Sequence, residues 1–339
     1  MSTDNKVPLK KRILIIQTAS LGDVILSTAL AETLKAQLEG AEIHYLVKKG
    51  YESLFNGHAF IHKVLIWDKT KSKYAGLFRL IREVRRNRYD AVINVQRFAS
   101  SGLITALSGA GMRSGFEKNP LSMFFTHKYK HEIGYVLPQP HEIERNHTLI
   151  STLVPGPALR PALYPTTEDF SFVSKFTTGS YITISPASLW FTKQFPEEKW
   201  IDFLNNISSG FTVILLGSGA DKSMCERISR QAGGEIVNLA GELSFLQSAA
   251  LMRSASMNYV NDSAPQHLAS AVNATVAAVF CSTVPAFGFG PLSDTAHIIE
   301  TKEALQCRPC GLHGHAECPE GHFKCAINIT TNQLTDLLP

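Results

Sequence analysis

The sequence has 339 residues, of which 44% are hydrophobic and 18% charged, and its formal net charge is +4. This length favours two domains, and the composition is that of a globular protein with enough apolar residues for a core in each. The absence of any run of about 18 apolar residues argues against a membrane-spanning helix. The basic N-terminal stretch also lacks the apolar region of a secretory signal, so we expect a cytoplasmic protein.

The net charge is divided unevenly along the chain. Residues 1–170 hold 23 Lys and Arg against 15 Asp and Glu, whereas residues 171–339 hold 10 against 14. Basic residues gather at positions 79–88 and 128–130. Each cluster can be a solvated helix face, but the split favours an anionic partner for the first half. We expect a phosphorylated substrate or a membrane surface rather than nucleic acid, because no nucleic-acid-binding motif accompanies the charge.

The chain is organised around its first strand and helix, Arg12–Leu34. Ile13–Ile16 is a continuous apolar run typical of a parallel strand buried on both faces, and helical periodicity resumes after the polar segment Gln17–Gly22. The loop that leaves a first strand of an open α/β sheet faces the ligand crevice. Its one acid, Asp23, is therefore a candidate functional residue; the alternative is that Asp23 only caps the helix.

Strands and helices alternate through the rest of the first half. The expected strands are Glu42–Val47, Ile61–Trp67, Ala91–Val95 and, as a strand or turn, Gly111–Phe116, and the expected helices are Leu77–Val84, Ser100–Ala110 and His141–Leu153. This order is typical of a wound parallel sheet. Pro120–Pro140 has an irregular pattern, which fits either a loop over a site or an ordinary surface excursion.

Four prolines between positions 155 and 165 place the interdomain linker at Val154–Thr178. The same alternation then restarts. The expected strands are Tyr181–Ile184, Phe211–Leu216, Ile236–Leu239, Met257–Val260 and Thr275–Phe280, and the expected helices are Glu197–Ile207, Lys222–Gln231, Phe245–Arg253 and Pro265–Val272. The sequence thus predicts two wound α/β domains, residues 1–165 and 166–339.

Three loops in the second half follow predicted strands and suit a phosphate-bearing ligand. Lys193, in the first, is an ammonium that can meet a phosphate, unless it is merely solvated. Gly217–Asp221 has small residues before a helix but lacks the full dinucleotide fingerprint, which argues against a nicotinamide enzyme. In Val260–His267, Pro265 favours a helix start whose N–H groups suit a pyrophosphate. His267 is a ligand contact or a buried structural histidine.

Four of the six cysteines lie near the C-terminus, at Cys307, Cys310, Cys318 and Cys325. Together with nearby histidines they provide enough ligands for a zinc site, and stable disulfides are disfavoured in a cytosolic chain. The second pair lacks the C-x2-C spacing. We therefore favour a thiol-rich loop without a metal and keep zinc as the alternative.

Four segments carry a resemblance to a known family. They read RILIIQTASLGDVILSTALAETLK, SPASLWFTKQFPEEKW, NDSAPQHLASAV and FGFGPLSD. In this order they resemble the ADP-heptose:lipopolysaccharide heptosyltransferase family, glycosyltransferase family 9, and the CRPC…CPEGHFKC ending is similar to one in that family. The resemblance runs from Arg12 to about Ile329.

The resemblance implies a GT-B architecture, in which two Rossmann-like, doubly wound domains face each other across a cleft. The first would bind the acceptor and the second the nucleotide-sugar. The implied activity is inverting transfer of heptose from ADP-heptose to the lipopolysaccharide inner core, with no cofactor and no metal. The implied site residues are the catalytic base Asp23, the phosphate-binding Lys193 and, at the donor-binding helix start, Asp262, Ser263, Ala264 and His267.

Ser188, in the first of the three loops, and Asp221 complete the predicted donor contacts, Asp221 as the candidate for holding the ribose. The chain departs from the family pattern at three points: Ala264 replaces Gly, Phe195 replaces Trp, and residues 280–283 replace a Gly-containing turn. These departures put the identity of the donor in doubt, but not the fold. The alternatives are a GT-B epimerase or transferase for another nucleotide-sugar, and a non-catalytic nucleotide-sugar-binding protein.

The expected mechanism uses both domains, and movement about the linker would assemble the site. Asp23 takes the proton of the acceptor hydroxyl as the general base. Lys193 and the amides of Ser263 and Ala264 stabilise the charge that develops on the diphosphate. The expected partners are the nucleotide-sugar and an anionic lipopolysaccharide-core acceptor, with peripheral contact to the cytoplasmic face of the inner membrane and none to nucleic acid.

Overall fold

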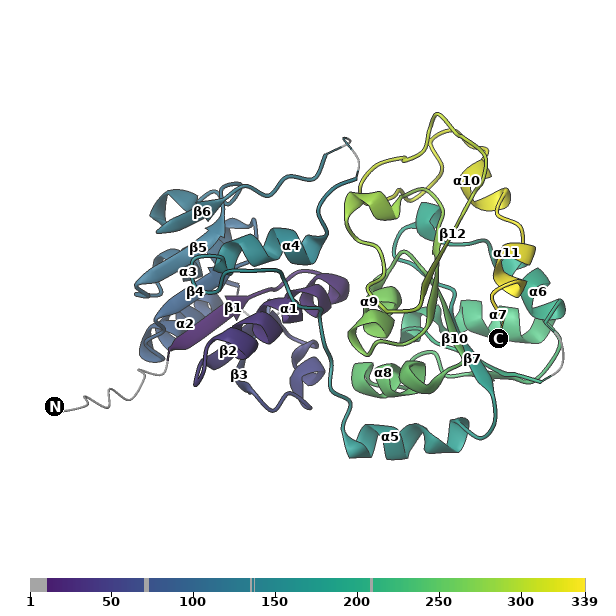
Figure 1. Ribbon diagram of the computed structural model, residues 1–339, viewed down its shortest axis with the longest axis horizontal. Coiled ribbons are helices and arrows are strands. Elements are labelled where there is room, and N and C mark those ends of the chain that lie inside the picture. The colour runs from purple at the N-terminus through teal and green to yellow at the C-terminus, as the bar shows by residue number, and fades with distance from the viewer. Residues whose placement is uncertain (1–10, 70–72, 135, 137, 208–209, 339) are drawn as a thin grey trace. The chain divides into compact units, whose positions relative to one another are not determined.

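The computed structural model describes residues 11–69, 73–134, 136, 138–207 and 210–338 (Figure 1). The chain divides into two compact units. One consists of Met1–Ile133 and Pro140–Ala162, and the other of Gly134–Gln139 and Leu163–Pro339. Each unit has its own six-stranded sheet.

The first unit is an all-parallel sheet flanked by helices (Figure 1). Its strands are β1 (Arg12–Ile16), β2 (Glu42–Lys48), β3 (Ile61–Trp67), β4 (Ala91–Asn94), β5 (Met112–Phe116) and β6 (His127–Tyr129). Its helices are α1 (Leu21–Gln37), α2 (Lys73–Arg86), α3 (Ala99–Ala106) and α4 (Glu142–His147). All residues of β4 are buried, as its apolar run predicts for a central parallel strand.

The second unit is built in the same way. Its strands are β7 (Tyr181–Ser185), β8 (Thr212–Leu215), β9 (Ile236–Asn238), β10 (Met257–Asn261), β11 (Val276–Phe280) and β12 (Ala296–Glu300). Its helices are α5 (Thr167–Val173), α6 (Glu197–Asn205), α7 (Lys222–Gln231), α8 (Phe245–Ser254), α9 (Ala264–Ala271), α10 (Lys324–Ile327) and α11 (Asn332–Thr335). Its core includes the rings of Phe195, Trp200, Phe203 and Tyr259, which meet edge-to-face or at a tilt.

The two sheets share one strand order. The first runs β3-β2-β1-β4-β5-β6, and the second runs β12-β11-β10-β7-β8-β9, which is the same order when the strands are counted from β7. This is the doubly wound order with its switch point beside the first strand, and ligands of such sheets bind outside the carboxyl ends of the strands at that point. The predicted fold class is confirmed. The loops after β1 and β4, and after β7 and β10, therefore hold the best-placed side chains.

The sequence interpretation missed regular structure in two segments. Pro120–Pro140 is not irregular throughout, because β6 (His127–Tyr129) pairs in parallel with β5 at the sheet edge. The expected linker, Val154–Thr178, contains α5, which packs against α8. Thr166 caps α5 in a capping box with Asp169, so a helix begins directly after the proline-rich stretch.

Other differences concern element ends and edges. The helix expected at Ser100–Ala110 ends at Ala106, and the helix expected at His141–Leu153 ends at His147 and continues as a 3-10 turn. The edge strand β12 (Ala296–Glu300) was missed because most of its residues are exposed or half-buried. An edge strand of this kind has no continuous apolar run by which it could be recognised.

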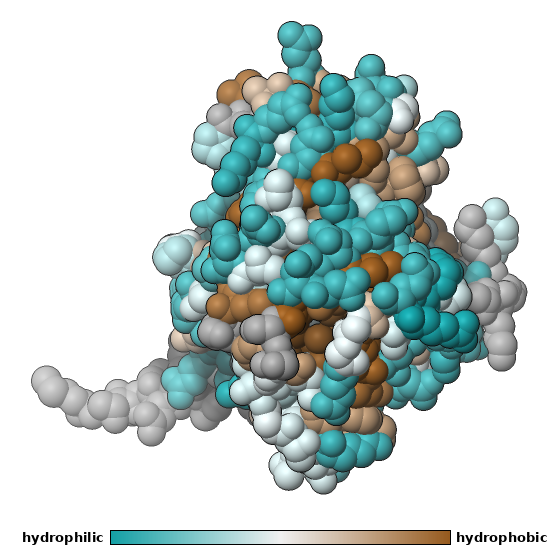
Figure 2. Space-filling model, turned by 90° about the vertical axis from the view of Figure 1, so that its right-hand side faces the viewer, coloured by the Kyte–Doolittle hydropathy of each residue, from teal (hydrophilic) through white to brown (hydrophobic). Residues whose placement is uncertain are grey.

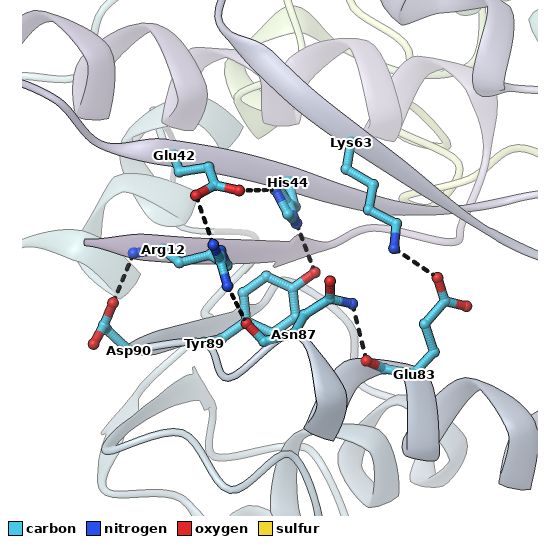
Figure 3. Close-up of polar contacts among 8 residues, drawn as sticks. All are labelled: Arg12, Glu42, His44, Lys63, Glu83, Asn87, Tyr89 and Asp90. Atoms are coloured by element: carbon cyan, nitrogen blue, oxygen red, sulfur yellow. Dashed lines mark hydrogen bonds and ion pairs between the residues drawn. The ribbon is translucent and has the colours of Figure 1, made fainter. Parts of the chain in front are cut away.

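A polar network closes the amino end of the first sheet (Figure 3). The sheet register places Arg12 beside Glu42, whose Oε2 lies 2.9 Å from Nη2 of the guanidinium. The other oxygen of Glu42 lies 3.0 Å from Nε2 of His44, and Nδ1 of His44 lies 2.8 Å from the Tyr89 hydroxyl. Burial lowers the pKa of His44, which favours its neutral imidazole. The network lies at the amino ends of the strands, on the opposite side of the sheet from their carboxyl ends, and it stabilises the register between the strands.

We expect the first unit to lose stability on acidification, because His58 is buried in its neutral form. Its ring centroid lies 5.7 Å from that of Phe55, and burial lowers its pKa from 6.5 to about 4. The unfolded chain therefore binds the proton more tightly. Stability that is present above pH 6.5 is lost as the pH falls toward 4, by roughly 3 kcal/mol in all. Urea unfolding at about pH 7 and about pH 5 should show that the free energy of unfolding falls less in His58→Leu than in the wild type. An equal fall in both proteins would show that His58 is not the source of the acid sensitivity.

The face of the molecule drawn in Figure 2 is largely hydrophilic, with hydrophobic side chains gathered in patches near its middle. Apolar atoms supply roughly 55–60% of the surface of ordinary folded proteins, so such patches mark no binding site by themselves. Within the described residues, no helix is long and apolar enough to cross a membrane.

Candidate active site

Asp23 lies at the start of α1, directly after the loop that leaves β1. The N-cap of this helix is Ser20, and Asp23, the third helical residue, contributes to capping through its side chain, as the capping alternative predicts. Its Oδ2 accepts hydrogen bonds from the Ser20 hydroxyl at 2.6 Å and the Ser20 amide at 3.2 Å, which completes a capping box. The positive end of the helix dipole stabilises the carboxylate charge. Because the residue is only half-buried, a substrate hydroxyl can reach it.

Two buried glutamines hold the loops at the switch point of the first sheet. Gln17 follows β1 and Gln96 follows β4, and the side-chain amide of Gln96 donates to the Gln17 side-chain oxygen. The same oxygen accepts the Ala19 amide at 3.2 Å. Asn119 donates to the Gln96 carbonyl at 3.0 Å. These contacts fix the backbone that presents Asp23, and the sequence analysis had assigned these residues no role.

In the second unit, Lys193 and Asp262 form an ion pair. Nζ of Lys193 lies 2.7 Å from Oδ2 of Asp262, and the two side chains are 15% and 8% exposed. The hydroxyl of Thr283 donates to the same Oδ2 at 2.6 Å. Lys193 is therefore not merely solvated. An ammonium has three donors, and the contact with Asp262 orients it while using only one of them.

Asn261 joins the two strands at the switch point of the second sheet. It is the last residue of β10, and its side-chain amide donates to the Pro186 carbonyl at 2.7 Å. Its side-chain oxygen accepts the amide of Phe195 at 3.0 Å. Both contacts hold the ends of the loop between β7 and α6, which carries Lys193. An Asn directly after a predicted strand could have suggested this role from the sequence.

The helix start after β10 has the predicted character. Ser263 is the N-cap of α9 and makes no side-chain capping bond, and Pro265 occupies the first turn. Ser263 and Ala264 are half-buried, so their backbone lies within reach of a ligand. His267 is buried one turn further along. The amides at this end carry the positive end of the helix dipole, which suits a phosphate.

Ser188 and Asp221 lie on neighbouring loops. Ser188 is half-buried in the Lys193 loop, and its carbonyl accepts the side-chain amide of Gln194 at 2.6 Å. Asp221 follows β8, and its Oδ2 accepts the amide and hydroxyl of Ser218, each at 2.7 Å. The structure thus brings Lys193 and Asp262 into direct contact. The side-chain hydrogen bonds of Asp221 described above lie within its own loop.

The sequence pattern of glycosyltransferase family 9 (heptosyltransferase) matches residues 77–321. The chain belongs to glycosyltransferase family 9.

Individual family members are similar along most of their length. Lipopolysaccharide heptosyltransferase 1 of Escherichia coli K12 is 24% identical over 300 residues, which cover 82% of this chain and 91% of the relative. The structure of E. coli ADP-heptose lipopolysaccharide heptosyltransferase II matches with a TM-score of 0.80 and 21% identity over 96% of this chain and 97% of that one. E. coli heptosyltransferase WaaC with ADP-2-deoxy-2-fluoro heptose matches with a TM-score of 0.69 and 20% identity over 96% and 98%. These structures share the GT-B fold with this chain.

In this glycosyltransferase, the C-terminal segment packs against the Lys193 loop through Thr192. The amide of Thr192 donates to the His315 carbonyl at 3.1 Å, and its hydroxyl accepts the His315 amide at 2.8 Å and the Ser282 hydroxyl at 3.1 Å. Gly314 has a φ of +77°, and a Cβ there would lie 3.1 Å from Cγ of Lys193. The segment therefore sets the position of the Lys193 side chain from one side.

Arg308 extends this support to Asp262. Its Nε donates to the Cys281 carbonyl at 2.7 Å, and its Nη2 donates to the Thr283 carbonyl at 2.9 Å and lies 2.6 Å from a carboxylate oxygen of Glu300. Thr283 in turn donates to Asp262. The sequence analysis missed Arg308 because it lies inside the C-x2-C spacing, which had been considered only as a metal motif.

We expect Thr192→Val to loosen the Lys193 loop. Valine keeps the volume of this buried side chain but leaves the His315 amide without its acceptor, which costs about 1–3 kcal/mol. Nucleotide-sugar affinity should fall together with stability, as measured by calorimetry and urea unfolding. Thr192→Ser keeps the hydroxyl and should behave like the wild type. Unchanged affinity in Thr192→Val would show that the C-terminal segment does not position Lys193.

The four C-terminal cysteines are free thiols. Cys307 Sγ lies 4.0 Å from Nε2 of His322. Burial raises the pKa of Cys310, and raises that of Cys325 to about 11, so both thiols stay protonated near neutral pH. Among the described residues, no three or more His, Cys, Asp and Glu side chains are placed to hold a metal ion. That the segment works without a metal stays a prediction.

Proposed function

We propose that this chain transfers heptose from ADP-heptose to the inner core of lipopolysaccharide with inversion at the anomeric carbon. What supports the proposal is the family match, together with the positions of its polar side chains: Asp23 follows β1, Lys193 follows β7 and Asp262 follows β10. These are switch-point strands of the two sheets, where doubly wound folds bind ligands. Solved relatives with ADP and with a fluorinated ADP-heptose support an ADP-heptose donor.

In the proposed reaction, Asp23 accepts the proton of the acceptor hydroxyl. The hydroxyl oxygen then forms a bond to the anomeric carbon as the bond to the diphosphate oxygen breaks on the opposite side. A positioned base of this kind contributes about 10²–10⁴-fold to the rate. The first unit thereby activates the acceptor.

The second unit stabilises the leaving diphosphate. Lys193 donates to the phosphate oxygens with the donors that Asp262 leaves available, and the amides at the start of α9, at Ser263 and Ala264, face the developing charge. Ser188 and His267 are further donor contacts in this proposal, and Asp221 holds the ribose. Because these donors are fixed by the fold, little reorganisation accompanies bond cleavage.

The test is incubation of the purified protein with ADP-heptose and other nucleotide-heptoses and nucleotide-hexoses, with and without a lipid A–Kdo acceptor. Mass spectrometry should show one heptose added to the acceptor, and NMR of the product should show inverted anomeric configuration. Transfer of another sugar would show that the donor is a different nucleotide-sugar. An epimerised nucleotide-sugar as the product would show that the protein is an epimerase and not a transferase. Donor binding without turnover would indicate a non-catalytic protein.

A further inference from the structure

Helix α2 has two faces of opposite character. Its inner face packs Leu80, Ile81 and Val84 into the core of the first sheet. Its outer face consists of exposed side chains that recur every three or four residues. These are Tyr74, Phe78, Arg79, Arg82, Arg85 and Arg86. The helix is thus anchored on one side and presents an aromatic and basic surface on the other.

The aromatic part of this outer face is unusually exposed. Tyr74 is 74% and Phe78 is 67% solvent-exposed. The two rings are four residues apart and therefore lie next to each other on the helix surface. A single exposed apolar residue is ordinary, but adjacent exposed aromatic rings expose a contiguous apolar area that is favourable to remove from water.

The basic part is not neutralised by acids. None of the four outer arginines forms an ion pair within the described part of the chain, and Arg85 donates to the Leu107 carbonyl at 3.4 Å. The single acid of the helix, Glu83, lies at the edge of this face and pairs with Lys63 at 2.9 Å. The arginines therefore present an uncompensated positive charge beside the two rings.

We propose that the outer face of α2 binds an anionic phospholipid surface. Arginines at a membrane surface are attracted by lipid phosphates, and Tyr and Phe side chains insert at the boundary between headgroups and acyl chains. A single-stranded nucleic acid also contacts aromatic and basic residues, but in a groove that follows the strand. Here the residues lie on the convex outside of a helix. The biological role of this membrane contact rests on the proposed function, since a lipid-linked acceptor lies in a membrane.

The test measures co-sedimentation of the full chain with vesicles, without donor or acceptor. The wild type should bind vesicles of phosphatidylcholine mixed with phosphatidylglycerol, bind phosphatidylcholine vesicles poorly, and lose affinity as salt rises. Phe78→Ser/Arg82→Glu should lower the affinity for mixed vesicles by about tenfold or more. The control Phe172→Ser/Lys175→Glu makes an equivalent change of ring and charge at an exposed Phe and Lys of the second unit, and should bind like the wild type.

Equal vesicle binding by the α2 variant and the wild type would overturn the assignment of this surface, as would salt-independent binding or none by the wild type. Tighter binding of the wild type to a DNA strand than to vesicles would assign the face to nucleic acid instead. Transfer to a water-soluble acceptor should be unchanged in the α2 variant. If the wild type binds vesicles but transfers no sugar, the proposed function fails while this inference stands.

Discussion

Asp23→Asn should lower turnover by about 10²-fold or more while leaving donor affinity and stability nearly unchanged. The asparagine side-chain oxygen can still accept the hydrogen bonds of Ser20, so a purely structural role predicts a loss of only a few tenths of a kcal/mol. A general base, in contrast, loses its proton-accepting group. A 10²-fold fall corresponds to roughly 2.7 kcal/mol of activation free energy, well above the capping effect. Steady-state transfer rates and urea unfolding together separate the two roles.

The matched control is Asp169→Asn. Asp169 forms the same capping box with Thr166, with hydrogen bonds to Oδ2 of 2.9 Å from both the amide and the hydroxyl, at a helix start that holds none of the predicted site residues. The same change there should cost similar stability and no activity. Retention of more than about a third of wild-type turnover by Asp23→Asn would remove Asp23 from the mechanism, because a lost base costs far more.

Lys193→Ala should weaken both donor binding and the fold. Removing Lys193 leaves the buried Asp262 carboxylate without its cation; breaking a fully buried pair costs about 3–5 kcal/mol, so this partly exposed pair should lose less. Lys193→Ala/Asp262→Asn removes both charges and should recover much of that stability. It should not recover donor affinity, because the positive charge that meets the diphosphate is still missing. Lys193→Arg should retain part of the affinity, since the charge remains but its geometry changes.

Calorimetric titration with the nucleotide-sugar and urea unfolding give the two readouts. Lys199→Ala is the control, because Lys199 follows the same loop and its ammonium donates to the Ile329 carbonyl at 3.1 Å. It should leave donor affinity unchanged. Wild-type donor affinity in the Lys193/Asp262 double variant would limit this ion pair to a structural role.

The sequence predicted the interior strands β2, β7 and β10 to within one residue, because nearly all of their residues are buried and most are apolar, which is a clear signal for a strand. The edge strand β3 (Ile61–Trp67) and the helix α7 (Lys222–Gln231) also begin and end at the predicted residues. The edge strands β6 and β12 lacked such a signal, since their side chains are half-buried or exposed. Helix α5 was missed because the sequence interpretation gave more weight to the prolines before it than to the capping residues that start it. The errors thus fall where one face of an element meets water or where two local signals compete.

The candidate site could be predicted residue by residue but not as an arrangement. Position after a strand singled out Lys193 and the loop that holds Asp262, and the family resemblance named Asp262 itself. Their contact depends on β7 and β10 being neighbours, although β8 and β9 lie between them in the chain. Thr283 and Arg308 could not be found in the same way, because they act through carbonyl groups and a carboxylate that only the folded chain brings near.

The division of the chain between the two units has a consequence for engineering hybrid enzymes. The backbone passes from one unit to the other three times, because a short segment ending at Gln139 belongs to the second unit, where the Gln139 amide donates to the Ala286 carbonyl at 2.9 Å. A chimera joined by a single crossover at residue 162 would therefore combine this segment from one parent with its packing partner from the other. Exchange of the second unit between relatives should yield folded proteins more often when the graft carries residues 134–139 together with the C-terminal half.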